Sequence, residues 1–174
     1  MTGAVKMMNE FWENTYFKDM ERTIVRHHEA REARLLERGE IQSTSGPDSA
    51  EMMAWEERES QVTFPFSNGR MLAYRAWRNS VQRGSSELEC DNLPFPRDMA
   101  DFSDTLKEAG CETLAVTEQS TALMRNLHAL AKLGWTMDCL CTVTRTDSGY
   151  GCEENDEVQG IRMVRGKTTA PQRD

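Results

Sequence analysis

The stretch CETLAVTEQSTALMRNLHALAKLGWTMDCLCTVTR, residues 111–145, decides the fold. Its first seven residues favour a β-strand. Ser120 is a suitable N-cap for the segment that follows, in which leucines recur at helical spacing until Gly134 ends the pattern. The alternating residues WTMDCLCTVTR then predict a second, longer strand. A strand, a helix and a strand in this order indicate a small domain built from both kinds of element.

The segments on either side extend this pattern. SELECDNLPF, residues 86–95, predicts a short strand, and prolines bracket the turn into a helix that ends at Gly110. Residues 146–157 predict a polar loop, and VQGIRMVRG, residues 158–166, a last strand. The order β-α-β-α-β-β indicates an α/β (α+β) fold, with about four strands in one sheet and two helices packed on one of its faces.

The N-terminal half has a different character. Residues 8–38 contain no Pro or Gly and predict one long helix, which Gly39 ends. Residues 41–50 have loop composition, and residues 70–82 return to helical spacing. We therefore expect three parts: a long helix in residues 1–40, a loop with short helices in residues 41–84, and the β-α-β-α-β-β domain in residues 85–174.

The chain is acidic. It has 29 Asp and Glu against 21 Lys and Arg among 174 residues, a formal charge of −8. Nucleic-acid binding depends on Lys and Arg displacing counterions from phosphates, so this balance argues against direct binding of DNA or RNA. It favours a partner that is itself basic.

Much of the negative charge lies in residues 85–118, with nine acids and two bases. Within FPRDMADFSDTLKEAG, residues 95–110, helical spacing brings four carboxylates near one face, which we expect to point to solvent: Asp98, Asp101, Asp104 and Glu108. Such a face can simply be solvated. It can also dock a basic partner, such as the nucleic-acid channel of an enzyme. A divalent metal site needs converging oxygens rather than a spread stripe, so we expect no metal there.

Two further groups are candidates for partner binding. The acidic loop residues Glu153, Glu154, Asp156 and Glu157 could extend the acidic surface. Aromatic residues crowd the start of the long helix, among them Trp12 and Tyr16. Trp and Tyr dominate the anchor positions of protein interfaces, although core packing or self-association of residues 8–38 explains the same cluster.

No catalytic signature is present. The strand-to-helix junction at 117–120 offers hydroxyl groups, with His128 on the following helix, but no glycine-rich phosphate loop and no nucleophile elbow. The five cysteines form no CxxC pair and are expected to be reduced thiols. We therefore expect no catalytic residues, no cofactor and no metal, with an enzyme built on the 117–120 junction as the alternative.

No apolar run is long enough to span a bilayer, and MTGAVKMMNEFWEN has no apolar core of the kind that a secretory signal needs. We expect a protein of the cytoplasm of a bacterial host. No membrane partner is expected.

Two stretches, NEFWENTYF (residues 9–17) and CETLAVTEQSTALMRNLHALAKLGW (residues 111–135), resemble small proteins carried by phages and conjugative elements of gut Firmicutes. Some small acidic proteins from that setting are anti-CRISPR inhibitors of the type II RNA-guided nuclease. The resemblance implies a stoichiometric inhibitor rather than an enzyme, and it assigns no site residues. With the charge pattern, it leads us to expect a non-enzymatic protein that blocks a basic nucleic-acid channel or an activation step of such a nuclease. The alternatives are the enzyme named above and a regulatory protein that dimerises through residues 8–38.

Overall fold

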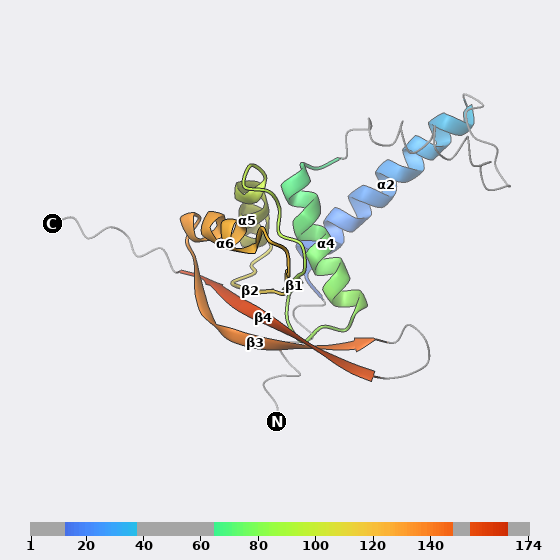
Figure 1. Cartoon of the computed structure of the whole chain (residues 1–174). Coiled ribbons are helices and arrows are strands. Elements are labelled where there is room, and N and C mark those ends of the chain that lie inside the picture. The colour runs from blue at the N-terminus through green and yellow to red at the C-terminus, as the bar shows by residue number, and fades with distance from the viewer. Residues whose placement is uncertain (1–12, 38–64, 148–153, 167–174) are drawn as a thin grey trace. The chain divides into compact units, whose positions relative to one another are not determined.

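The computed structural model of the protein describes residues 13–37, 65–147 and 154–166 (Figure 1). In these ranges four helices and four strands occur, which confirms the predicted α+β fold. The elements in chain order are α2 (Thr15–Glu37), α4 (Asn68–Gln82), β1 (Glu89–Cys90), α5 (Met99–Glu108), β2 (Thr113–Val116), α6 (Leu123–Lys132), β3 (Trp135–Asp147) and β4 (Glu154–Arg165). No helix in this part of the chain is both long and apolar enough to cross a membrane.

The chain divides into two compact units. One consists of Met1–Lys18 and Ser67–Asp174, and the other of Asp19–Phe66. The division falls inside α2, so the first residues of this helix belong to the unit that holds the sheet. Residues 70–82, predicted to be helical, lie within α4, and α4 also belongs to the unit with the sheet.

The sheet is mixed, with the strand order β1-β2-β4-β3. β1 and β2 are parallel, and β4 runs antiparallel to both of its neighbours. β2 pairs only with residues 161–164 of β4, whereas β3 pairs with β4 along nearly its whole length. The β3–β4 hairpin therefore extends well past the short strands, as Figure 1 shows.

One sequence prediction about this hairpin is wrong. Residues 146–157 have loop composition, but Thr146 and Asp147 lie in β3 and residues 154–157 lie in β4. Pairing between the strands extends through this polar segment because main-chain hydrogen bonds depend little on side-chain polarity, and tertiary context overrides strand propensity. The remaining residues of the expected loop, 148–153, lie outside the described ranges.

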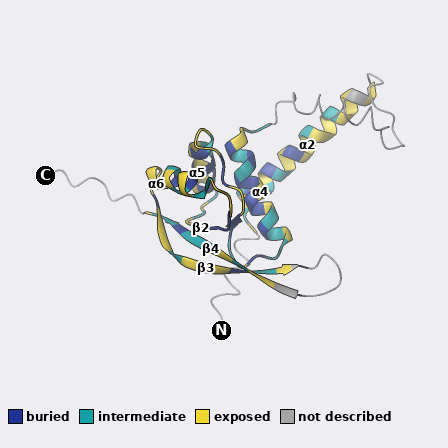
Figure 2. Cartoon of the chain, viewed as in Figure 1, coloured by how far each residue is buried: buried dark blue, intermediate teal, exposed yellow. Residues whose placement is uncertain are grey.

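The core lies between α5, α6 and the strands. Phe102 and Leu106 of α5 are fully buried, together with Leu114 of β2 and Leu130 of α6. Trp135, at the start of β3, is also fully buried, and its indole N–H donates to Ser103 Oγ at 2.8 Å. This bond satisfies the one polar group of the largest core side chain. Figure 2 shows the contrast between buried α5 positions and the largely exposed β3.

The predicted strand in residues 86–95 is reduced to Glu89–Cys90, because the chain before it covers the outer edge of β3. The N–H of Ser86 donates to the carbonyl of Thr144 at 2.8 Å, and the N–H of Thr144 donates to Ser86 Oγ at 3.1 Å. Gly84 has a φ of +57°, which lets the chain turn close to Thr146. Covering an edge in this way limits its pairing with other chains.

Candidate functional site

The carboxylates of α5 meet the beginning of α4. Asp98 accepts a hydrogen bond from Asn68 Nδ2 at 2.8 Å, and Asp101 accepts one from Ser67 Oγ. Ser67 is also the N-cap of α4. These two negative charges therefore lie at the positive end of the α4 dipole, where anionic groups are stabilising.

Gly69 makes this approach possible. A Cβ atom at this position would lie 2.5 Å from the carbonyl oxygen of Asp98 and 2.7 Å from Cβ of Asp101. Contacts that short do not occur, so any larger residue would push the two helices apart. The sequence offered no sign of this contact, because Asn68-Gly69 is equally typical of a turn.

Glu108, at the other end of α5, is also engaged. Arg70 Nη2 lies 3.0 Å from Glu108 Oε2, and the hydroxyl of Tyr16 donates to the same oxygen at 2.6 Å. Burial, together with this hydrogen bond to a carboxylate, raises the pKa of Tyr16 above its ordinary value. Tyr16, predicted as a partner-binding residue, therefore already has a polar partner within the chain.

Asp104 alone among the four α5 carboxylates is exposed and has no hydrogen-bond or ion-pair partner in the described part of the chain. Asp98 and Asp101 are half-buried, and Glu108 is exposed but bonded. The carboxylate stripe expected to face solvent is therefore largely committed to contacts with α4 and Tyr16.

The second acidic group lies at the end of the β3–β4 hairpin where residues 148–153 connect the two strands. The strand register places Asp147 opposite Glu154, Arg145 opposite Asp156, and Thr144 opposite Glu157. We call Asp147, Glu154, Asp156 and Glu157 the acidic hairpin end. Like charges directly opposite one another destabilise a strand pair. Asp156 and Glu157 are exposed, and the predicted residues Glu153 and Trp12 lie outside the described ranges.

Arg145, the one base opposite these acids, points its charge inward. Its guanidinium forms an ion pair with Glu89, whose side chain is 1% exposed, and its Nη1 reaches Asp156 only at 3.8 Å. Arg83 is a second cation on Glu89, at 3.2 Å. Arg145 is thus shared between the buried Glu89 and the more distant Asp156 of the acidic hairpin end.

Glu89 is a buried charge that sequence reasoning missed. Burial by itself would raise its pKa, but hydrogen bonds from Arg145, Ser85 and Thr117 outweigh this effect and hold the pKa below its ordinary value. Ser80 Oγ accepts the backbone N–H of the same residue at 2.9 Å. Nothing in SELEC separates Glu89 from Glu87, which forms a partly exposed ion pair with Arg162.

The strand-to-helix junction does not assemble a reactive group. Thr117 Oγ donates to Glu89 at 3.1 Å, and Glu118 accepts the backbone N–H of Leu93 at 3.1 Å as well as the hydroxyl of Ser120. Ser120 Oγ in turn accepts the N–H of Ala122 at 3.1 Å. These bonds connect β2 to the loop after β1 and to the start of α6.

His128 is exposed on α6 and lines a pocket to which neither Thr117 nor Ser120 contributes. Among the described residues no three His, Cys, Asp or Glu side chains converge as a metal site requires. The four cysteines in these ranges are free thiols, and Cys152 lies outside them.

A family model described as a domain of unknown function, DUF7698, matches residues 72–165, which is more than half of the chain. The match begins inside α4 and ends at the last residue of β4, so it includes the sheet, α5 and α6. No curated protein and no solved structure matches the chain.

Proposed function

Because the chain belongs to the DUF7698 family, whose function its description leaves open, we propose a function from this domain's own charges. The domain is a non-enzymatic protein-binding inhibitor from a mobile element, of the anti-CRISPR type. It binds a basic protein partner, the nucleic-acid channel of an RNA-guided nuclease, through the acidic hairpin end. Occupying that channel hinders DNA binding or the rearrangement that precedes cleavage.

The observation that carries this proposal is the strand register at the end of the hairpin. Asp147 lies opposite Glu154, and Asp156 and Glu157 lie two and three positions further along β4, opposite Arg145 and Thr144. A strand pair that keeps like charges face to face gives up stability. A cationic partner would relieve that repulsion, so binding gains free energy that folding does not supply.

The reach of the hairpin supports the same function. Residues 154–160 of β4 pair only with β3, and this part of the hairpin lies beyond the strands that pack on α5 and α6. Residues 84–86 cover the edge of β3 as far as Thr146, and the end of the hairpin beyond them is a narrow two-stranded projection that can enter a channel too small for a whole domain. Attraction between opposite charges should speed association and weaken as salt screens it.

The non-enzymatic character is supported by the junction at 117–120. The side chains of Thr117, Glu118 and Ser120 all form hydrogen bonds within the chain. The carboxylates beside the two hydroxyls, Glu89 and Glu118, also accept hydrogen bonds from Arg145 and from the backbone N–H of Leu93.

The test is binding to a guide-loaded RNA-guided nuclease, measured by interferometry at rising salt, with target-DNA cleavage as a second readout. The variant Glu154→Gln/Asp156→Asn/Glu157→Gln should slow association about tenfold or more and flatten the salt dependence. The matched control is Glu29→Gln/Glu32→Gln/Glu37→Gln, which removes three exposed carboxylates from α2 and should leave binding unchanged.

Two results would overturn this proposal. One is that neither cleavage nor DNA binding by the nuclease changes at saturating protein. The other is that both triple variants weaken binding equally, since net charge rather than the acidic hairpin end would then explain the effect.

The long helix supplies a second candidate, a regulatory protein that dimerises through residues 8–38. Val25 and Leu36 are 47% and 41% exposed, and eleven residues of separation place them on the same face of α2. Two exposed aliphatic side chains on one helical face suit self-association. Light scattering on the full chain and on Val25→Glu/Leu36→Glu tests this second candidate function. A monomer in both samples excludes dimerisation through residues 8–38.

A further inference from the structure

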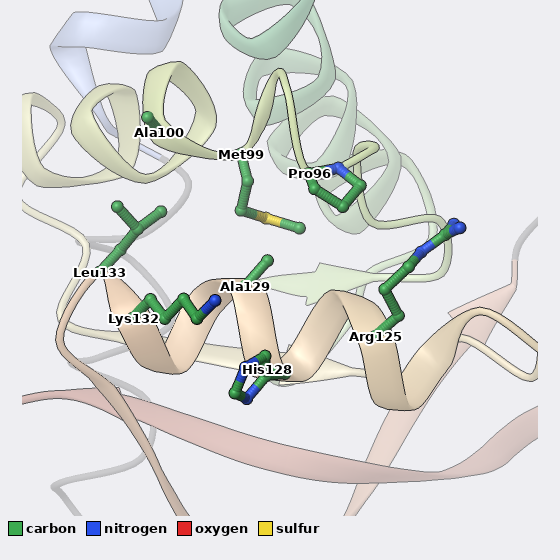
Figure 3. A pocket seen from close by; sticks show the side chains of 8 residues that line it. All are labelled: Pro96, Met99, Ala100, Arg125, His128, Ala129, Lys132 and Leu133. Carbon is green, nitrogen blue, oxygen red and sulfur yellow. The ribbon is translucent and has the colours of Figure 1, made fainter.

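A pocket of about 340 Å³ lies between the start of α5 and one face of α6 (Figure 3). Pro96, Met99 and Ala100 form one wall, and Ala129 and Leu133 of α6 form the other. In Figure 3 the side chain of Met99 points across the pocket towards Ala129. The apolar side chains of the two walls line a pocket that is open to solvent. We call this pocket the α5–α6 groove and its apolar lining the floor.

The rim of the α5–α6 groove is cationic, in contrast with the acidic chain as a whole. Arg125, His128 and Lys132 lie at spacings of three and four along α6, which puts them on one face of this helix. All three are exposed. None of the eight residues that line the groove is a carboxylate.

Exposed apolar side chains flank the same place. Phe95, 60% exposed, directly precedes Pro96 of the groove wall, and the guanidinium of Arg125 lies 6.0 Å from the centre of its ring. Met124, 75% exposed, is the residue before Arg125. Apolar side chains left in water next to an apolar groove are typical of an interaction site.

We infer that the α5–α6 groove binds a short amphipathic, acidic segment of a partner protein. One or two apolar side chains of that segment fill the floor between Met99 and Ala129, and its carboxylates pair with Arg125 and Lys132. This is the arrangement by which an amphipathic helix lies in a groove, with its anchors at helical spacing. The site is separate from the acidic hairpin end, and it selects a partner of the opposite charge.

The groove favours an acidic protein segment over a nucleic acid. Two exposed cations, Arg125 and Lys132, compare with six to ten phosphate contacts in a strongly salt-dependent DNA-binding site, and the net charge of −8 repels a long polyanion. An apolar floor contributes no binding free energy for a phosphate backbone. It does contribute to a segment that carries both aliphatic side chains and carboxylates.

The probe is a fluorescent helical peptide of about 15 residues, with leucines at three- and four-residue spacing and glutamates between them. Its binding to the full chain is followed by fluorescence anisotropy. The double variant Arg125→Glu/Lys132→Glu should weaken binding about tenfold or more. The matched control Arg75→Glu/Arg78→Glu reverses two exposed charges on α4 and should change binding less than about twofold.

A steric variant keeps the charges and closes the floor. Ala100 is exposed and lines the groove, so Ala100→Phe should block the peptide while the circular dichroism of the protein stays unchanged. Loss of binding in this variant and in the double variant, but not in the control, supports the inference. Equal loss in the control, equal binding of a peptide with lysine in place of glutamate, or tighter binding of a single-stranded oligonucleotide would overturn it.

Discussion

The carboxylates at the α4–α5 contact and those at the acidic hairpin end belong to the same residue types but have opposite roles. Asp98, Asp101 and Glu108 each have a hydrogen-bond donor within the chain. At the hairpin end the register puts Asp147 opposite Glu154 instead. The first group holds two helices together, whereas in the second the register sets one pair of like-charged residues face to face, and Asp156 lies 3.8 Å from Arg145. The number of acids in a segment therefore does not indicate a binding surface, whereas their partners do.

The largest effect should come from the carboxylate that is buried most completely. Glu89→Ala leaves Arg145 and Arg83 without their shared anion, and removing one member of a buried ion pair costs about 3–5 kcal/mol. Urea denaturation should show this loss in the free energy of unfolding. Glu157→Ala, at an exposed position of the hairpin, is the comparison and should stay within about 0.5 kcal/mol. Equal losses of the free energy of unfolding in both variants would remove the distinction between carboxylates bonded within the chain and exposed carboxylates.

Acid should weaken the protein through the same residue. The folded-state pKa of Glu89 lies below its ordinary value of 4.5, so its stabilising contribution is complete above pH 4.5 and is lost as the pH falls through the folded pKa. The free energy of unfolding, measured in urea from about pH 6 to pH 3, should therefore fall more steeply for the natural chain than for Glu89→Gln. Parallel curves would show that other carboxylates account for the acid sensitivity.

The α4–α5 contact should respond to a single methyl group. Gly69→Ala places a Cβ 2.5 Å from the carbonyl of Asp98, and overpacking of this kind costs about 1–3 kcal/mol. Thermal unfolding measures the effect. Gly166→Ala is the control, because its Cβ would meet only the carbonyl of Gly134 at 3.4 Å, an ordinary contact. A stable Gly69→Ala protein would mean that the two helices approach less closely.

Changing the charges on each side of the comparison should have smaller, opposite effects. Asp98→Asn/Asp101→Asn/Glu108→Gln should destabilise by about 1 kcal/mol in total, since partly exposed pairs contribute little each. Glu154→Lys should stabilise by about 0.2–1 kcal/mol, because it places a cation opposite Asp147. Both are measured by urea denaturation at low salt. Destabilisation by Glu154→Lys would contradict the repulsion on which the proposed function depends.

The elements of the domain could be predicted because local patterns produce them. Leucine spacing, the glycines that end the helices and strand alternation placed α5, β2, α6 and β3 within a few residues. The predicted N-cap Ser120 is wrong, because α6 is capped at Ala122. The extent of the hairpin could not be predicted. Thr146 and Asp147 form strand because they pair with Asn155 and Glu154, and no local propensity encodes a pairing across a turn.

The candidate site was predictable only in part. Acidic side chains at 98–108 and 153–157 are visible in the sequence, and both groups were predicted to bind a partner. Which group keeps uncompensated charge depends on where Ser67, Asn68 and Arg70 lie, some 30 residues away along the chain. The cationic rim on α6 went unnoticed because Arg125, His128 and Lys132 gain meaning only beside the apolar wall from α5.

The sequence by itself determined the α+β class, the positions of most helices and strands, and the excess of negative charge, because these follow from local spacing and composition. Only the tertiary structure decided which charged side chains form hydrogen bonds and ion pairs within the protein. A carboxylate is free or bonded according to what lies within about 3 Å of it, and distant parts of the chain supply those neighbours.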